Sequence, residues 1–125
     1  MKQDIRTVVD KMLDLKLVHI GINCENGEEA MDIAILLEQF LHMPYKEENS
    51  SIFCGVKEFE LMKKPGRGRK GHIAIGVSNI DRGVNYLKKR GVEFEENSPV
   101  IKENRKTAVY FAEEIAGFAV HLMRM

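Results

Sequence analysis

Four side chains of the kinds that bind divalent metals stand at matching places in two halves of the sequence. His-Ile-Gly-Ile at 19–22 aligns with His-Ile-Ala-Ile at 72–75, an offset of 53 residues. Phe-Glu-Leu-Met at 59–62 aligns with Val-His-Leu-Met at 120–123, an offset of 61. The candidate ligands in these four segments are His19, Glu60, His72 and His121.

The alternation of apolar residues with the candidates predicts that each candidate ligand lies on the face of its strand that points away from the helix of its own half. In each segment the apolar residues alternate with the candidate at the period of a β-strand and are expected to pack under a helix, which sends the candidate to the opposite face. A single histidine in a strand is more often bound to a neighbour than to a metal. Three histidines and one glutamate at equivalent positions favour a catalytic site for zinc, nickel, manganese, iron or cobalt, with coordination positions open for substrate.

Each half of the sequence has the pattern of a β-α-β-β-β module. In the first half, a strand over 17–24 precedes Asn26, which is expected to cap a helix over about 27–42. Pro44 is expected to close this helix, and short strands are predicted at 51–55 and 57–63.

The second half repeats this order from a strand that begins at His72. Ser78, with Asp81 three residues later, predicts a capped helix that ends at Gly91. The remaining strands are predicted near 92–96, 107–113 and 118–124, with an inserted loop at 98–105.

Length and composition predict one cytoplasmic globular domain of two repeats and exclude a multidomain enzyme. The chain has 125 residues, with 19 basic and 19 acidic side chains, so it lacks the positive field that holds nucleic acid without sequence preference. Cys24 and Cys54 are too few for a disulfide framework and are expected to be buried thiols. Charges interrupt the predicted leader helix at 1–16, and no apolar run approaches the ~20 residues of a membrane span.

A basic segment separates repeat one, 17–64, from repeat two, 71–125. It contains Lys63, Lys64 and the three candidate substrate-binding residues, which are Arg67, Arg69 and Lys70. Its glycines and charges favour an exposed linker. The alternative function is to bind a phosphate or carboxylate of the substrate.

The motifs resemble those of the vicinal-oxygen-chelate superfamily, which includes glyoxalase I, methylmalonyl-CoA epimerase, extradiol dioxygenases and bleomycin-resistance proteins. The resemblance covers residues 17–125 and rests on the segments at 19–22 and 59–62, on Gly-His-Ile-Ala-Ile at 71–75, and on Gly-Phe-Ala-Val-His-Leu at 117–122. It implies an α+β domain in which two paired β-α-β-β-β modules form a curved trough of mixed sheet.

The resemblance also implies a site and a chemistry. A divalent metal would be held by His19, Glu60, His72 and His121, and a substrate with two neighbouring oxygens would chelate it. The implied activity is that of a lyase, isomerase or epimerase that stabilises an enolate of a small oxo- or hydroxy-acid. Glu60 is the only carboxylate of the set, so it would be ligand and catalytic base.

The sequence departs from the superfamily at three positions. His121 stands where Glu or Gln is usual, which weakens an assignment as glyoxalase I. Asn23 and Lys64 stand where glutathione-dependent glyoxalases carry Arg and Asn, so glutathione is not carried over as a substrate.

Two alternatives to an enzyme remain open. The chain could bind a small molecule without turnover, as bleomycin-resistance proteins do. It also resembles, at 17–24, 45–55 and 71–77, modules appended to keto-deoxy-sugar-acid aldolases, which indicates an accessory or sensing role. A homodimer and a small oxyanion ligand fit every one of these functions, and neither nucleic acid nor a membrane is expected as a partner.

Overall fold

A computed structural model of the chain describes residues 14–97 and 99–125, without the side chain of Lys102. The chain forms two compact units. The first unit contains Val18–Ile73 and Glu114–Ala119, and the second contains Ala74–Glu113, Val120–Met125 and the described residues up to Leu17.

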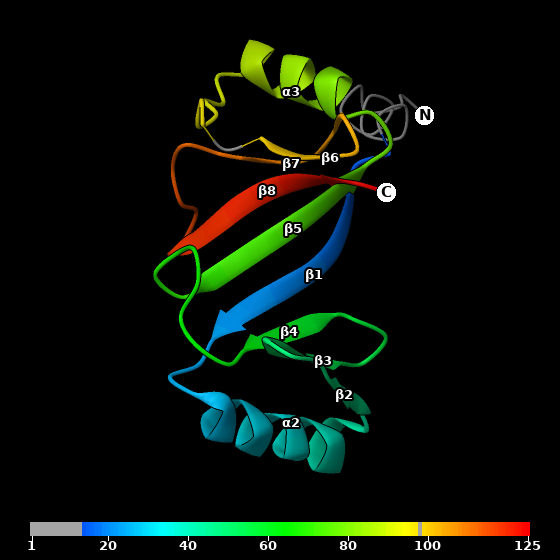
Figure 1. Ribbon diagram of the computed structural model, residues 1–125, viewed down its shortest axis with the longest axis vertical. Helices are drawn as coiled ribbons and strands as arrows, with labels where there is room; N and C mark the ends of the chain where they lie inside the picture. The colour runs from blue at the N-terminus through cyan, green and yellow to red at the C-terminus, as the bar shows by residue number, and fades with distance from the viewer. Residues whose placement is uncertain (1–13, 98) are drawn as a thin grey trace, which may run out of the picture. The chain divides into compact units, whose positions relative to one another are not determined.

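In the first unit, α2 (Gly27–Leu41) packs on a sheet of short strands (Figure 1). The elements of this unit are β1 (Lys16–Asn23), α2, β2 (Tyr45–Glu47), β3 (Ser51–Cys54) and β4 (Phe59–Met62). The strand order is β2-β3-β4-β1. β2, β3 and β4 pair antiparallel, whereas β4 and β1 pair parallel.

Local signals fix both ends of α2. The side chain of Asn26 accepts a hydrogen bond from the amide of Glu29 at 2.8 Å, as the sequence predicted for the cap. The helix ends when His42 adopts a φ of 56°, and Pro44 follows two residues later. Ala30 and Ala34 are fully buried on the face of α2 that packs on the strands.

Both cysteines lie in the core of the first unit. Cys24 and Cys54 are free thiols, 1% and 0% exposed, which confirms the prediction that they are buried. They pack with Ile52, Leu61 and the two buried alanines of α2.

The second unit repeats the order of elements. Its elements are α3 (Ile80–Lys89), β6 (Val100–Lys102), β7 (Arg105–Tyr110) and the larger parts of β5 (Gly71–Val77) and β8 (Phe118–Arg124), whose first residues belong to the first unit. The strand order is β5-β8-β7-β6. Its core comprises Val77, Ile80, Val109 and Leu122. Gly83 lets α3 approach the strands closely, because a Cβ there would lie 3.2 Å from Leu122 Cδ1.

The predicted cap of the second helix is wrong by one residue. Asn79, not Ser78, is the cap, and its side chain accepts from the amide of Arg82 at 3.0 Å. Asp81 pairs instead with Lys106, at 3.1 Å. The helix does end as expected, with Gly91 in a left-handed conformation at a φ of 96°.

The strand predicted at 92–96 is also wrong. Within that segment Phe94 makes an isolated bridge to Phe111, and the strand β6 lies at 100–102, inside the predicted loop. The turn between β6 and β7 is formed by Glu103 and Asn104, both at positive φ. A glutamate at such a position is not a usual turn signal, which explains why the hairpin was missed.

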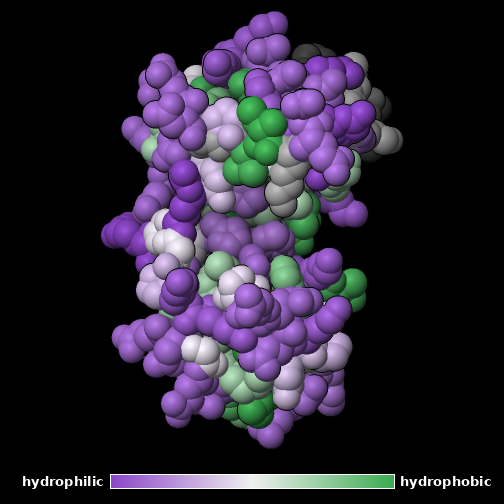
Figure 2. Space-filling view, in the orientation of Figure 1, coloured by the Kyte–Doolittle hydropathy of each residue, from purple (hydrophilic) through white to green (hydrophobic). Residues whose placement is uncertain are grey.

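The α+β class and the two β-α-β-β-β modules with mixed pairing are confirmed. The predicted leader falls mainly on residues 1–13, outside the described residues, and β1 begins at Lys16. Neither helix in the described part of the chain is long and apolar enough to cross a membrane. The face seen in Figure 2 is mostly hydrophilic, as expected when the apolar side chains fill two cores.

Replacing each of the two candidate cap residues by alanine tests the observed start of α3. Asn79→Ala removes the hydrogen bond to the first turn and should lower the free energy of unfolding by about 1 kcal/mol. Ser78→Ala is the matched control and should change it by less than about 0.5 kcal/mol. Chemical denaturation measures both, and a larger loss for Ser78→Ala would contradict the assignment.

Candidate metal centre

Three of the four predicted ligands meet within the first unit. His19 Nε2 lies 3.1 Å from His72 Nε2, His72 Nε2 lies 3.1 Å from Glu60 Oε1, and His19 Nε2 lies 3.3 Å from the same oxygen. Each imidazole is 12% exposed and the carboxylate 16%. Two nitrogens and one oxygen thus form a nearly equilateral triangle that solvent barely reaches.

Strand pairing explains why these side chains meet. Gly21 of β1 is the register partner of Glu60 on β4, so His19 and Glu60 stand on adjacent strands. Ile22 packs into the core of the first unit, and alternation therefore sends His19 to the other face of β1. The face predicted for His19 is the face observed.

Two glycines make room for His72. A Cβ on Gly21 would overlap the imidazole of His72, and a Cβ on Gly71 would overlap the carbonyl of Gly21. Gly71 also has a φ of 149°, which favours glycine. β1 and the start of β5 therefore approach closely, and the ring of His72 covers the space that a side chain at position 21 would fill.

Ser51 fixes the second oxygen of Glu60. Its hydroxyl donates to Glu60 Oε2 at 2.8 Å, and Ser51 itself is 2% exposed. Burial alone would raise the pKa of the Glu60 carboxyl, but hydrogen bonds from His19, His72 and Ser51 outweigh it and lower this pKa far below its ordinary value of 4.5. Glu60 is therefore an anion at neutral pH.

The three atoms fit a divalent metal. Two ligands each about 2.1 Å from one ion, at tetrahedral or octahedral angles, are about 3.0–3.4 Å apart, and all three observed separations fall in that range. Two imidazoles and one carboxylate form a common set for iron, zinc or manganese. Oε2 of Glu60, the oxygen outside the triangle, accepts a hydrogen bond from Ser51. Carboxylates that bind a metal are usually hydrogen-bonded by a neighbouring group in this way.

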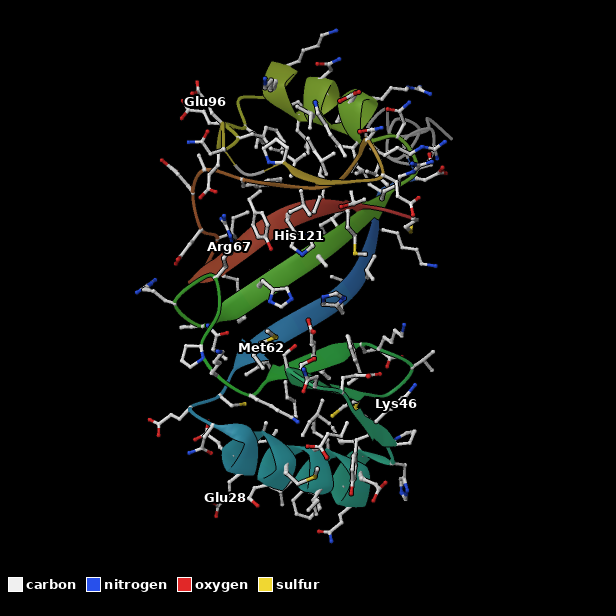
Figure 3. The ribbon with its side chains drawn as sticks, viewed as in Figure 1. Glu28, Lys46, Met62, Arg67, Glu96 and His121 are labelled. Carbon is white, nitrogen blue, oxygen red and sulfur yellow. The ribbon has the colours of Figure 1, made fainter. Side chains whose placement is uncertain are left out.

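His121 lies on β8 in the second unit, and Figure 3 labels it. It is 8% exposed and its ring lies 4.8 Å from that of Tyr110, its register partner on β7. His121 Nδ1 lies 3.3 Å from the carbonyl oxygen of Leu122. A carbonyl only accepts, so Nδ1 donates in this contact. Its role as fourth ligand stays a prediction.

The basic segment is a fixed loop and not a loose linker. Asn23 Nδ2 donates to the carbonyl of Gly68 at 2.9 Å, and Asn23 Oδ1 accepts from the amide of Gly66 at 3.1 Å. Arg69 is held at both its amide and Nε by the carboxylate of Glu114, at 3.2 and 3.4 Å.

All three candidate substrate-binding residues are exposed, and Figure 3 labels Arg67 on this loop. The amide of Lys70 bonds the carbonyl of Gly117 at 2.8 Å. Binding of substrate by Arg67, Arg69 and Lys70 stays a prediction.

Two neighbours of the triangle were missed by the sequence analysis. Ser51 and Phe53 alternate with the buried Ile52 and Cys54, so both face the same side as Glu60. The ring of Phe53 meets the ring of His19 edge to face, with centroids 6.0 Å apart. Alternation within β3 would have found the face, but only the register with β4 identifies the contact.

No family model and no curated protein matches the chain. Solved structures do match. A hypothetical protein of Bacillus halodurans superposes with a TM-score of 0.61 at 20% identity, covering 89% of this chain and 94% of the other. Methylmalonyl-CoA epimerase of Mycobacterium tuberculosis gives 0.56 at 20% identity, covering 86% of each chain. A Streptomyces coelicolor methylmalonyl-CoA epimerase in complex with 2-nitronate-propionyl-CoA gives 0.57 at 15% identity, covering 87% and 93%.

These likenesses define the fold of the chain, which is the glyoxalase-like fold. Methylmalonyl-CoA epimerase is one of the proteins in the superfamily that the sequence motifs resemble, so fold and motifs agree.

Gly21→Ala tests whether the site depends on the space above residue 21. The added methyl group would collide with His72, so the ring must move, and the free energy of unfolding should fall by about 1–3 kcal/mol. NMR of the imidazole nitrogens should show a changed environment for His72. Gly27→Ala is the control, because its Cβ would meet nothing closer than 3.6 Å. An unchanged His72 signal in Gly21→Ala would contradict the packing.

Ser51→Ala tests the anionic state of Glu60 in the metal-free protein. The folded-state pKa of Glu60 is lowered, so its ionisation stabilises the fold above about pH 4.5 and less as pH falls toward the lower pKa. Losing a hydrogen bond to a charged group should cost about 2 kcal/mol near pH 7, with a smaller loss in acid. Denaturation of wild type and variant from pH 7 to 3 measures this, with exposed Ser50→Ala as control. A loss that grows in acid would contradict the account.

Proposed function

We propose that this chain is a metal-dependent enzyme of the epimerase or isomerase kind that acts on a small oxo- or hydroxy-acid. The observation that carries the proposal is the triangle of His19, Glu60 and His72. The three ligand atoms lie 3.1–3.3 Å apart, which is the spacing of ligands around one divalent cation, and two imidazoles with one carboxylate are a common donor set for such an ion.

The proposed ligands are His19, Glu60 and His72, with His121 as the fourth. The ion would be zinc, nickel, manganese, iron or cobalt, as its donor set admits each of them. When bound, the metal would polarise the carbonyl of the substrate and would stabilise the negative charge of an enolate.

The hydrogen bonds of Glu60 favour the ligand role over the base role for this residue. Oε1 faces both imidazoles and Oε2 accepts from Ser51, so neither oxygen is turned toward a substrate. A carboxylate held so firmly as an anion is a good ligand and a poor proton acceptor. We therefore propose that Glu60 contributes to catalysis by binding the metal through Oε1, while the hydrogen bond from Ser51 holds Oε2.

The solved structures support the epimerase kind over the lyase kind. Methylmalonyl-CoA epimerases recur among them, one in complex with methylmalonyl-CoA. Acyl thioesters of this type therefore belong among the substrates to test, beside free oxo- and hydroxy-acids. The homodimer expected from the sequence stays a prediction.

Metal content is the first test. Untagged protein should carry about one transition-metal ion per chain by elemental analysis, either as purified or after loading. His19→Ala, Glu60→Gln and His72→Ala should each lose it, and His121→Ala should weaken it. His42→Asn is the control, because His42 is exposed at the end of α2. Protein that takes up none of the five metals would overturn the enzyme proposal and leave a binding function.

Proton exchange tests turnover across a panel of candidate substrates. In D2O, an enzyme that forms an enolate exchanges the proton beside the substrate carbonyl, and the NMR signal of that proton disappears. Metal-loaded wild type should exchange at least one of the oxo-acids, hydroxy-acids or methylmalonyl-CoA, and Glu60→Gln should not. Tight ligand binding with no exchange would indicate a binding protein.

A further inference from the structure

A second feature of the first unit is a cavity of about 310 Å³ at the end of its sheet. It is lined by β2, β3 and the turn between β3 and β4, and its charged lining residues are Lys46, Glu48 and Lys57, beside Tyr45, Phe53 and Val56. This volume is within the range of small-molecule sites, and most of the lining is apolar.

The cavity borders the triangle of candidate ligands. Phe53 on β3 is the register partner of both Lys46 on β2 and Glu60 on β4, so these three residues form one cross-strand row on one face of the sheet. The ring of Phe53 is both a wall of the cavity and the aromatic neighbour of His19. Lys46 and Glu60 stand two strands apart, about 10 Å. One small molecule could therefore reach from the triangle into the cavity.

Lys57 is one of two lysines that line the cavity. Its ammonium lies over the ring of Phe53, 5.7 Å from the centroid. Among the described residues no carboxylate lies within ion-pair distance of Lys57, whereas Lys46 pairs with Glu48 at 3.6 Å. Of the two lysines that line the cavity, Lys57 is therefore the one that is not in an ion pair with a described carboxylate.

The backbone holds Lys57 in a conformation that favours glycine. Its φ is 132°, and Gly55 at the start of the same turn has a φ of 79°. The carboxylate of Glu58 braces the turn by accepting from the amide of Val56 at 2.6 Å. Strained residues persist where the surroundings fix them and are concentrated at functional sites.

We propose that this cavity binds a carboxylate at the end of an apolar segment, with Phe53 against the segment and Lys57 as the partner of the carboxylate. The next step rests on the proposed function: the apolar segment is the end of the substrate that lies away from the metal. The preferred substrates are then oxo- or hydroxy-acids that carry a second carboxylate beyond a short hydrocarbon chain.

Hexanoate tests the cavity in the full-length, metal-free protein. Its affinity, measured from amide NMR shifts around the cavity, should fall about threefold to tenfold in Lys57→Gln and recover in Lys57→Arg. Lys64→Gln, at an exposed lysine outside the cavity, is the matched control. Lys57→Gly should also lose affinity while raising the midpoint of thermal unfolding, because glycine relieves the strain. Equal hexanoate affinity in wild type and Lys57→Gln would overturn the proposal.

A matched pair of acids tests the substrate assignment in the metal-loaded protein. 2-Oxoadipate and 2-oxohexanoate have the same chain length and differ in the terminal carboxylate. Calorimetry should show 2-oxoadipate binding about threefold to tenfold more tightly to wild type, and equally to Lys57→Gln. Equal affinities in wild type would overturn the assignment. Retained hexanoate binding in a protein that takes up no metal would overturn the proposed function and this assignment, but would support the cavity as a carboxylate site.

Discussion

The candidate site depends on the close approach of two backbones. β1 and the start of β5 can meet only because position 21 and position 71 have no side chain. That approach leaves room above Gly21 for the imidazole of His72, which then faces His19 and Glu60. Steric space, more than any single hydrogen bond, therefore determines that the three polar groups converge in the first unit.

The second constraint is the charge of Glu60. A carboxylate that is only 16% exposed costs free energy unless it is paired and hydrogen-bonded. Two imidazoles and the hydroxyl of Ser51 supply these bonds. The same contacts place both imidazole nitrogens beside Oε1 and Ser51 beside Oε2, so Oε1 and the two nitrogens can share one metal. The imidazoles and the Ser51 hydroxyl that stabilise the buried carboxylate thus also orient it for its proposed role as a metal ligand.

Alternation along the strands predicted much of the site. A period of two sends His19, Glu60 and His72 away from the helix of their module, whatever the tertiary arrangement, and the internal repeat makes His19 equivalent to His72 and Glu60 equivalent to His121. Ser51 and Phe53 could not be found this way, because their contacts depend on the register between β3 and β4. The contacts that hold the basic segment, such as those of Asn23 on β1 with Gly66 and Gly68, likewise come from residues distant in sequence and have no local signal.

Local sequence signals also separate the secondary-structure elements that were predicted correctly from those that were missed. α2 was predicted because its cap and its buried alanines are local signals, whereas the hairpin of β6 and β7 turns on Glu103 at positive φ, which no local rule favours.

X-ray absorption spectroscopy on the zinc-loaded protein tests the central claim most directly. The account predicts a first shell of nitrogen and oxygen at about 2.0–2.1 Å, with the outer-shell scattering of at least two imidazoles. A shell that contains sulfur at about 2.3 Å would mean that Cys24 or Cys54 binds the metal after leaving the core. That result, or a spectrum without imidazole scattering, would contradict the site proposed at His19, Glu60 and His72.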